Sequence, residues 1–389
     1  MTSSSALFVV IAVLTLGIWV YLLAFRGGFW LSAERDDAVP PAPSAWPSVA
    51  AVIPARNEAA SIGATIASLM RQDYRGRLAI LLVDDESEDG TADVARSAAS
   101  AAQHRHHLTV ITGRKVPAGW TGKLWAMKQG IEAADTDGSV DYLLLTDADI
   151  THEPDSVRWL AGQAEARGLV LTSFMAKLRC QSLAERSHVP AFIFFFQMLF
   201  PFAWVNRTNA ATAAAAGGCM LVRADALRQT GGVERIRGAL IDDCALARTM
   251  KAFGPIWLGL TDRVHSIRPY QHWQDVKDMI SRSAYAQLGY SPLALLGTTA
   301  GLALTFLAAP LLALFTDGPT RVIGMATWAL MALAFQPTLR FYRLSPLWGL
   351  ALPAIALLYM LYTLDSAYQY SVGRGGSWKG RVQANVSHQ

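Results

Sequence analysis

The apolar segment Ala6–Phe25 near the start of the chain constrains the fold most strongly. At a rise of about 1.5 Å per residue, a helix of this length spans about 30 Å, the thickness of the hydrocarbon core of a bilayer. A secretory signal peptide is the alternative, but Met1–Ser5 carries no basic residue and the apolar stretch exceeds the usual length of roughly 7 to 15 residues. We therefore expect residues 1–28 to form an N-terminal transmembrane anchor.

The charges around this segment predict which side of the membrane the rest of the chain occupies. Arg26 and Arg35 follow the apolar stretch, and basic residues near membrane-spanning segments prefer the cytoplasm. We therefore expect the chain after the anchor to be cytoplasmic. The net charge of +4 is small and mixed along the chain, which argues against a nucleic-acid partner.

Three further apolar stretches lie near the C-terminus: Leu293–Phe315, Val322–Phe335 and Leu347–Leu364. Apolar residues make up 52% of the chain and charged residues 16%, a composition that favours lipid as part of the surroundings. We expect transmembrane helices in residues 291–366 and a basic tail over residues 367–389. The middle stretch is short and the tail is basic, so the sequence leaves open the number of crossings and the side of the tail.

Residues 48–290 show the alternation of strands and helices that is typical of an α/β domain with a mostly parallel sheet. The expected strands are Ser48–Pro54, Leu78–Val83, Leu108–Ile111 and Tyr142–Leu145, and the expected helices include Ser61–Gln72 and Lys123–Ala133. A proline-rich linker, Pro40–Pro47, precedes them. The absence of GxGxxG after the first strand and of GxxxxGK[ST] argues against dinucleotide-binding and P-loop sites.

Two pairs of acidic residues follow predicted strands, where ligands of such sheets bind. Asp84 and Asp85 end one strand and are candidates for binding a base or ribose, although an Asx turn and a helix cap would also use them. Asp147 and Asp149 follow another strand and offer two hard oxygen ligands for Mg²⁺ or Mn²⁺ bridged to a diphosphate.

A third acidic pair, Asp242–Asp243, precedes a predicted helix. One carboxylate could cap the helix, or it could act as a general base that removes a proton from an acceptor hydroxyl. Periodicity alone does not choose between these roles. Lys123 could contact a phosphate or be a solvated helix lysine.

Several motifs resemble those of glycosyltransferase family 2, a group of inverting enzymes with the GT-A fold, a Rossmann-like α/β domain. In sequence order they are AVIPARNEAASI, LLVDDESEDGT, GKLWAMKQGI, LLLTDADI, and GGCMLVRADALRQTGG followed by IDDCALA. The resemblance implies that Asp243 is the catalytic base. At the position of its neighbour Asp242 the family usually has Glu. It also implies metal binding by Asp149 and Asp147 and donor binding by Pro54, Asn57, Glu58, Asp84, Asp85, Lys123 and Asp147.

The family's membrane-bound members often carry a QxxRW motif, and its counterpart here, Met279–Ser283, keeps only Arg282. The missing Gln and Trp argue against a processive polysaccharide synthase. Arg282 could contact the donor diphosphate or be an ordinary interface arginine.

The apolar segment Val189–Val205 contains Gln197 and Pro201. A crossing here would place Asp147 and Asp243 on opposite sides of the membrane, so we expect the segment to lie along the interface, with a buried core helix as the alternative.

The overall plan looks most like hopanoid-biosynthesis-associated glycosyltransferases of bacteria, and ceramide glucosyltransferases are similar. This resemblance implies an integral protein of the bacterial inner membrane that moves a hexose from a nucleotide-sugar, expected to be a UDP-sugar, to a membrane lipid. Transfer to polyprenyl phosphate or a carotenoid is an alternative, and so is a non-catalytic membrane subunit that binds nucleotide-sugar or lipid.

Overall fold

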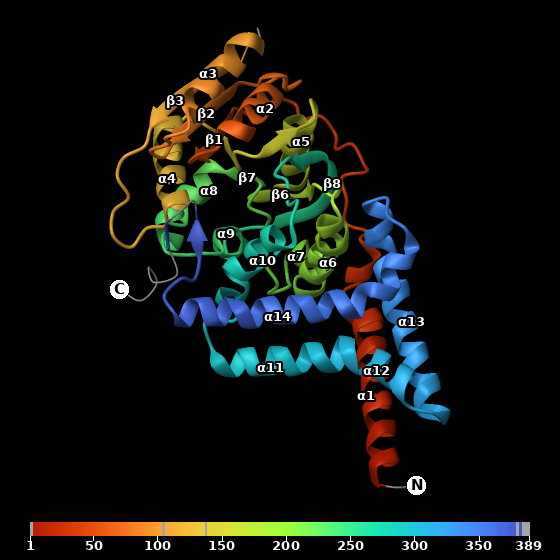
Figure 1. The fold of residues 1–389 in the computed structure, drawn as a ribbon. Coiled ribbons are helices and arrows are strands. Elements are labelled where there is room, and N and C mark those ends of the chain that lie inside the picture. The colour runs from red at the N-terminus through yellow and green to blue at the C-terminus, as the bar shows by residue number, and fades with distance from the viewer. Residues whose placement is uncertain (1–2, 103–105, 137, 379–380, 383–389) are drawn as a thin grey trace. The chain divides into compact units, whose positions relative to one another are not determined.

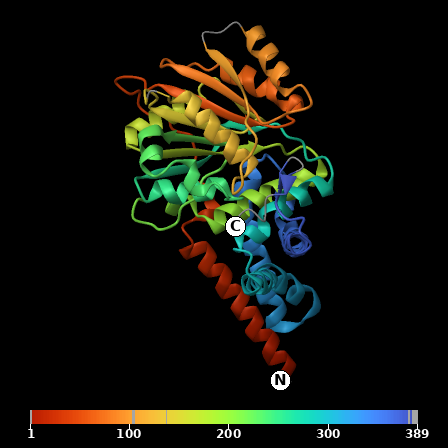
Figure 2. The ribbon, with the colours of Figure 1, turned by 90° about the vertical axis from the view of Figure 1, so that its left-hand side faces the viewer.

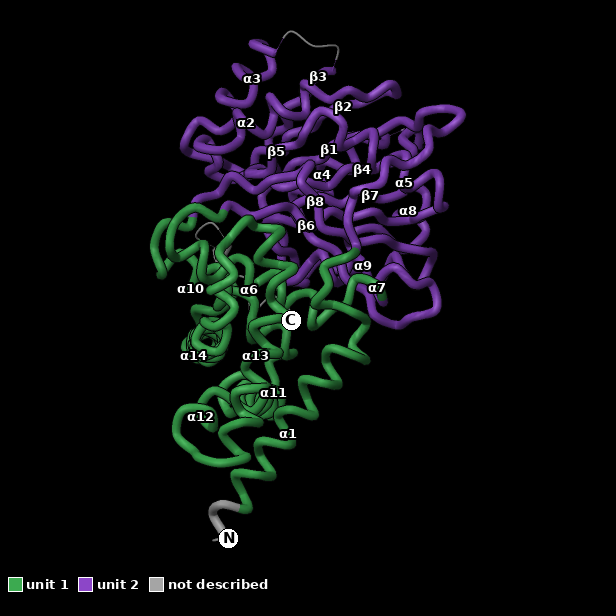
Figure 3. Tube along the Cα trace, turned by 90° about the vertical axis from the view of Figure 1, so that its right-hand side faces the viewer, with its two compact units in different colours: residues 1–33, 180–203, 270–376 green, residues 34–179, 204–269, 377–389 purple. Residues whose placement is uncertain are grey.

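The computed structural model describes residues 3–102, 106–136, 138–378 and 381–382. Its contacts divide the chain into two compact units, coloured separately in Figure 3. Unit 1 comprises residues 1–33, 180–203 and 270–376, and unit 2 comprises residues 34–179, 204–269 and 377–389. Within the basic tail, residues 379–380 and 383–389 lie outside the described residues.

Unit 2 is built on a mixed, mostly parallel sheet, which confirms the predicted α/β class (Figures 1 and 2). Within the described residues the strand order is β3-β2-β1-β4-β7-β6-β8-β5. Strand β1 pairs in parallel with β2 and β4, whereas β7 runs antiparallel to β4 and β6. The bounds are β1 Val49–Ala55, β2 Leu78–Asp84, β3 His107–Thr112, β4 Tyr142–Thr146, β5 Ile150–His152, β6 Leu171–Leu178, β7 Cys219–Arg223 and β8 Ile256–Ser266.

The helices of the α/β region connect these strands. They are α2 Ala59–Met70, α3 Thr91–Ala102, α4 Gly122–Ala134, α5 Ser156–Arg167, α8 Ala224–Gln229 and α9 Asp242–Lys251, with a 3-10 turn, η2, at Val233–Ile236. A short helix, α7, covers Phe202–Val205, and a two-stranded ribbon pairs β9 Ser377–Trp378 with β10 Arg381–Val382.

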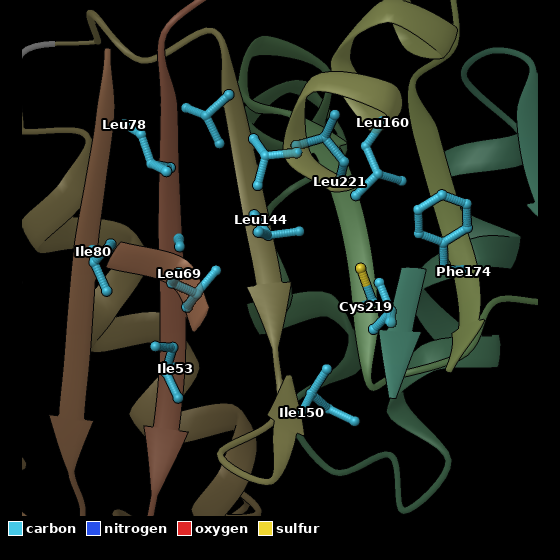
Figure 4. Close-up of a cluster of buried hydrophobic side chains, with 14 of the residues drawn as sticks. Ile53, Leu69, Leu78, Ile80, Leu144, Ile150, Leu160, Phe174, Cys219 and Leu221 are labelled. Carbon is cyan, nitrogen blue, oxygen red and sulfur yellow. The ribbon is translucent and has the colours of Figure 1, made fainter. Parts of the chain in front are cut away.

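The core of unit 2 follows from the alternation of side chains along the strands. Ile53 and Ile80 lie on one sheet face and pack with Leu69 of α2, as the close-up in Figure 4 shows. Val52, the neighbour of Ile53, lies on the opposite face against α4. A Cβ at Gly130 of α4 would stand 2.4 Å from Val52 Cγ1, so a glycine at this position lets the helix approach the sheet closely.

Unit 1 contains the apolar helices and the more polar helix α10. They are α1 Ser3–Phe25, α6 Leu183–Leu199, α10 Trp273–Gln287, α11 Pro292–Leu302, η3 Ala303–Leu307, α12 Ala308–Phe315, α13 Gly318–Phe341 and α14 Leu352–Ser371, with short turns η1 Phe29–Leu31 and η4 Pro346–Ala351. In the described part of the chain, four helical stretches are long and apolar enough to cross a membrane: Ala6–Phe25, Pro292–Phe315, Gly318–Phe341 and Pro346–Ser371. They overlap the predicted anchor and the three predicted C-terminal stretches.

These candidate spans do not all run in one direction. Helices α11 and α14 contact each other, and both run across the direction of α1 (Figures 1 and 2). Helices that cross one bilayer are tilted by only about 20° on average. Length and composition therefore do not by themselves make all four stretches straight crossings of one membrane.

The segment Val189–Val205 forms the second half of α6, a break at Phe200–Pro201, and α7. Helix α6 groups with the apolar helices, and its Phe194 ring lies 5.3 Å from that of Phe29 and 5.3 Å from that of Phe335. The predicted position of this segment along a membrane interface stays a prediction.

Candidate functional site

A lysine joins two of the predicted acidic pairs. Lys123 Nζ lies 3.0 Å from Asp147 Oδ1 and 3.2 Å from Asp242 Oδ2. Lys123 stands in the first turn of α4, where the Thr121 side chain caps the helix by accepting from the Leu124 N–H. Burial alone would lower the pKa of Lys123, but the neighbouring Asp147 and Asp242 carboxylates more than offset it and raise this pKa. Lys123 is therefore a cation that holds the end of β4 to the start of α9.

Asp243 is held beside this cluster by backbone donors. Its Oδ2 accepts from the Gly217 N–H at 2.9 Å, and its Oδ1 accepts from the Cys244 N–H at 2.7 Å. A Cβ at Gly217 would lie 3.3 Å from both Asp243 Oδ2 and Lys123 Nζ, so the glycine lets the backbone reach the carboxylate. The N-cap of α9 is Ile241, so neither Asp242 nor Asp243 is the capping residue.

The environment of Asp243 favours its protonated form. Burial and the neighbouring Asp242 carboxylate raise the pKa of Asp243 to about 6, against the opposing effects of Lys123 and the two N–H donors. A carboxylate with a pKa near neutral pH is suited to proton transfer, because it is ionised at pH 7 and still basic enough to take a proton. This pKa suits the predicted role of Asp243 as a general base, and that role stays a prediction.

Asp149, the other residue of the predicted metal pair, is paired with an arginine that the sequence reasoning missed. Arg268 Nε donates to Asp149 Oδ2 at 2.6 Å, and Arg268 Nη2 donates to Glu58 Oε1 at 2.6 Å. Arg268 lies two residues beyond β8, and β8 runs parallel to β6. A basic residue just after a strand was the available signal, since the acidic pairs had been found by the same rule.

Buried polar groups fix the turn that carries Asp147 and Asp149. Thr146 Oγ1 donates to the Gly218 carbonyl at 2.8 Å and lies 3.1 Å from His152 Nε2. Burial lowers the pKa of His152 to about 3, so its imidazole is neutral at ordinary pH. His152 is therefore a structural support of the turn rather than a charged ligand.

The run Asp84–Thr91 positions the loop after β1. Ser87, Asp89 and Thr91 accept through their side chains from the backbone N–H groups of residues 57, 59 and 58, at 3.0, 2.9 and 2.9 Å. In return, Asn57 Oδ1 accepts from the Glu88 N–H at 2.9 Å. These bonds hold Asn57 at a positive φ of 51° and present the adjacent Glu58 to Arg268.

The predicted donor residues Asp84 and Asp85 end β2 beside this loop. Asp84 Oδ1 accepts from the Ser87 N–H at 3.1 Å, which is the turn-forming role left open by the sequence. The Asp85 side chain is buried, and its backbone carbonyl accepts from Arg56 Nη1 at 2.6 Å. The second oxygen of the Asp84 carboxylate is a further acceptor, and the donor role of Asp84 stays a prediction.

Two further predicted donor residues are Pro54 and Arg282. Pro54 is buried near the end of β1, opposite Val83, and β4 pairs with β1 only as far as Val52. Arg282 lies on α10 in unit 1, so its donor role stays a prediction.

The residues present fit a divalent cation that is shared with a ligand. Among the described residues, no group of three or more His, Cys, Asp or Glu side chains forms a complete metal site. Asp147 and Asp149 offer carboxylate oxygens two residues apart. Each carboxylate is paired with a basic side chain, Asp147 with Lys123 and Asp149 with Arg268. Mg²⁺ is commonly held by one or two carboxylates plus substrate phosphates, which matches this donor set.

Comparison with known proteins shows which family and which relative the chain resembles in sequence. The family model described as "Glycosyl transferase family 2" matches residues 50–231. An N-acetylglucosaminyltransferase of Rhizobium leguminosarum bv. viciae is 38% identical over 116 residues, which cover 30% of this chain and 25% of that relative's length. The aligned part is thus a minor portion of both proteins.

A solved structure shares the fold over most of the chain. The mannosyltransferase PcManGT from Pyrobaculum calidifontis, in complex with GDP-Man and Mn²⁺, superposes with a TM-score of 0.56 at 18% identity and covers 92% of this chain and 99% of that one. At this identity the likeness concerns the fold alone. Residues 50–231 therefore resemble glycosyl transferase family 2, and the sheet of unit 2 has a GT-A-like fold.

Proposed function

We propose that this chain is a membrane-bound inverting glycosyltransferase that moves a hexose from a nucleotide-sugar donor to a lipid acceptor. The observation that carries the proposal is the meeting of Asp147, Asp242 and Asp243 around Lys123. In this arrangement the predicted metal ligand Asp147 and the proposed base Asp243 lie near one lysine, in a chain whose residues 50–231 match the glycosyl transferase family 2 model.

The reaction we propose is a single displacement. Asp243 takes the proton of the acceptor hydroxyl while the hydroxyl oxygen forms a bond to the anomeric carbon of the sugar. The bond between that carbon and the diphosphate oxygen breaks, and the electron pair leaves with the nucleoside diphosphate. Attack opposite the leaving group inverts the anomeric centre.

Asp149 and Asp147 would hold Mg²⁺ or Mn²⁺, which neutralises charge on the leaving diphosphate when it is bound. The complex of PcManGT with GDP-Man and Mn²⁺ supports a divalent ion in this fold. Lys123 holds Asp147 and Asp242 in place and adds positive charge at the same edge, which stabilises the negative charge that the leaving group develops.

The donor nucleotide would lie over the loops after β1 and β2. Asp84 or Asp85 would accept hydrogen bonds from the base and ribose, and Pro54 near the end of β1 would line the donor site together with Asn57 and Glu58 of the adjacent loop. The side chains of Ser87, Asp89 and Thr91 accept hydrogen bonds from backbone N–H groups of this loop. These bonds support the assignment, since a fixed loop binds ligand at a lower entropic cost. Arg282 would contact the diphosphate.

The apolar helices of unit 1 support a lipid acceptor. Side chains such as Leu293, Leu296 and Leu314 are exposed at 81%, 68% and 56%, which suits contact with acyl chains rather than water. We propose that unit 1 sits in the bacterial inner membrane with the sheet domain in the cytoplasm, and that the acceptor is a polycyclic lipid of hopanoid type. Polyprenyl phosphate and carotenoid acceptors remain alternatives.

The test is transfer in membranes that contain the full chain. Membranes with Mn²⁺ are incubated with labelled UDP-sugars and, separately, GDP-mannose, and the lipids are analysed by mass spectrometry. We expect a glycosylated lipid, and we expect Asp149→Ala to lower the rate about 10²-fold or more. Asp93→Ala is the control, because Asp93 is exposed on α3 and pairs with Arg96.

Two outcomes would contradict the proposal. Equal rates for Asp149→Ala and the parent would remove the metal assignment. Calorimetric binding of a nucleotide-sugar without any turnover, across all lipid extracts tried, would favour the non-catalytic binding subunit instead.

A further inference from the structure

Arg268 joins two carboxylates that come from distant parts of unit 2. Its Nε and Nη2 atoms each donate across 2.6 Å, to Asp149 Oδ2 and Glu58 Oε1. Both carboxylate side chains are 11% exposed, so the pairs are largely shielded from water. Burial alone would lower the pKa of Arg268, but the Asp149 and Glu58 carboxylates raise it, so the guanidinium stays charged.

A divalent cation bound to Asp149 would share its carboxylate with the guanidinium of Arg268. The Oδ2 atom that Arg268 occupies belongs to the carboxylate proposed to bind the metal. Two cations on one carboxylate repel each other strongly at such short distances in a shielded site. The metal and Arg268 therefore compete for Asp149.

The basic partners of the two carboxylates in the proposed metal pair differ in where their second carboxylate contact lies. Lys123 on Asp147 has a second anchor in Asp242, within the cluster itself. Arg268 has its second anchor in Glu58, whose N–H is fixed by Thr91. If the guanidinium of Arg268 leaves Asp149, its bond to Glu58 keeps it close by. Its Nε–H group is then available to the diphosphate that is proposed to bind there.

A planar guanidinium binds phosphate oxygens well, often through two parallel hydrogen bonds. We propose that Arg268 is a positioning residue that competes with the divalent metal for Asp149 and is drawn off by the diphosphate of the nucleotide. This inference rests on the proposed function for the identity of the metal ligands. Its consequence is that metal binds weakly alone and much more tightly together with nucleotide.

Linkage gives this competition a measurable form. If nucleotide diphosphate strengthens Mn²⁺ binding by a factor, Mn²⁺ strengthens nucleotide binding by the same factor. Part of that factor comes from direct contact between ion and phosphate, and part comes from the removal of Arg268. Replacement of Arg268 abolishes the second part, so Mn²⁺ binds more tightly without nucleotide and the coupling factor falls.

The experiment measures free Mn²⁺ by electron paramagnetic resonance during titration of the purified full chain in detergent. The titration is run without nucleotide and with saturating UDP or GDP. We expect Arg268→Gln to bind Mn²⁺ about tenfold more tightly than the parent without nucleotide, the equilibrium effect of losing one charged hydrogen bond. Arg268→Lys keeps the charge but loses the planar fork, so we expect it to bind Mn²⁺ with an intermediate affinity.

Arg263→Gln is the matched control. Arg263 also contacts two carboxylates, at Asp36 and Asp155, but neither belongs to the proposed metal pair. We expect its Mn²⁺ affinity to equal that of the parent. An equal gain in this control would overturn the inference, because it would reflect general loss of positive charge.

A fourth variant separates this inference from the proposed function. Asp149→Asn should lose Mn²⁺ binding; if it binds Mn²⁺ as the parent does, the metal assignment itself fails. If Asp149→Asn loses binding while Arg268→Gln and Arg268→Lys match the parent in both affinity and coupling, the competition fails and the proposed function stands. Should Arg268→Gln not fold, by gel filtration and circular dichroism, Arg268→Lys decides the question alone.

Discussion

The environment of Asp243 predicts how transfer depends on pH. Burial and the Asp242 carboxylate raise the pKa of Asp243 to about 6, and a general base works only when ionised. With this pKa, about nine-tenths of the base is ionised at pH 7 and about one-tenth at pH 5. We therefore expect kcat/KM to fall roughly tenfold between pH 7 and pH 5.

The assay is the initial rate of sugar transfer from pH 5 to pH 8, with saturating Mn²⁺ and subsaturating donor. Asp242→Asn supplies the diagnostic comparison, because it removes the like charge that contributes to the raised pKa of Asp243. We expect its acidic limb to move to lower pH, whatever its absolute rate. Asp243→Asn should lose transfer at every pH.

Two results would refute this reasoning. A profile that stays flat from pH 5 to pH 8 would mean that no group with a raised pKa takes the proton. An acidic limb that stays in place in Asp242→Asn would mean that the limb belongs to another group. In either case Asp243 would be a structural residue held by the Gly217 and Cys244 N–H groups.

The same shift has a consequence for stability, with a definite sign. The folded-state pKa of Asp243 is raised above its ordinary value of 3.8, so the folded protein holds the proton more tightly than the unfolded chain. The favourable contribution of protonated Asp243 to the stability of the folded protein is complete below about pH 3.8 and is lost as pH rises through about 6. Asp243→Asn removes the buried charge, so its Tm relative to the parent should be higher at pH 8 than at pH 5.

Two further substitutions test how the fold positions the site. Gly130→Ala places a methyl group 2.4 Å from Val52 Cγ1, so overpacking of about 1 to 3 kcal/mol should exceed the gain in helix propensity of roughly 1 kcal/mol. A Tm in detergent at or above that of the parent would contradict this packing argument. Asp89→Ala removes the acceptor for the Ala59 N–H, and we expect a several-fold higher KM for the donor; Glu88→Ala, with an exposed side chain, is the control.

The sequence alone was sufficient to predict the parallel part of the sheet. Strands β1, β2 and β4 are continuous apolar runs, as expected for strands buried on both faces, and polar residues follow the apolar run of each strand. The acidic residues could be found because the carboxyl ends of parallel strands meet at one edge. Local pattern therefore located Asp84, Asp147 and their neighbours.

The antiparallel half of the sheet could not be predicted in the same way. Strand β7 pairs with both β4 and β6, and β5 pairs with β8, through contacts between residues far apart in sequence. No local periodicity encodes which strand lies next to which. Arg268 belongs to this class, because its partners Glu58 and Asp149 are 210 and 119 residues away.

Lys123 shows a different limit of sequence reasoning. The sequence left open a phosphate contact and a solvated helix lysine, whereas the structure gives its ammonium group two carboxylate partners, Asp147 and Asp242. The distinction depends on how far α9 lies from β4, which the sequence does not specify. A phosphate contact stays a prediction, and such a contact would have to share the ammonium group with these two carboxylates.

The two basic residues explain how this part of unit 2 can hold several acidic side chains. Lys123 and Arg268 partly neutralise Asp147, Asp149, Asp242 and Glu58, and they leave the Asp243 carboxylate with backbone donors as its hydrogen-bond partners. A divalent ion and a diphosphate bring charges that largely cancel, so their arrival changes the potential at Asp243 little. The raised pKa of Asp243, the proposed base, should therefore persist in the complex, and the acidic limb of kcat should lie close to that of kcat/KM.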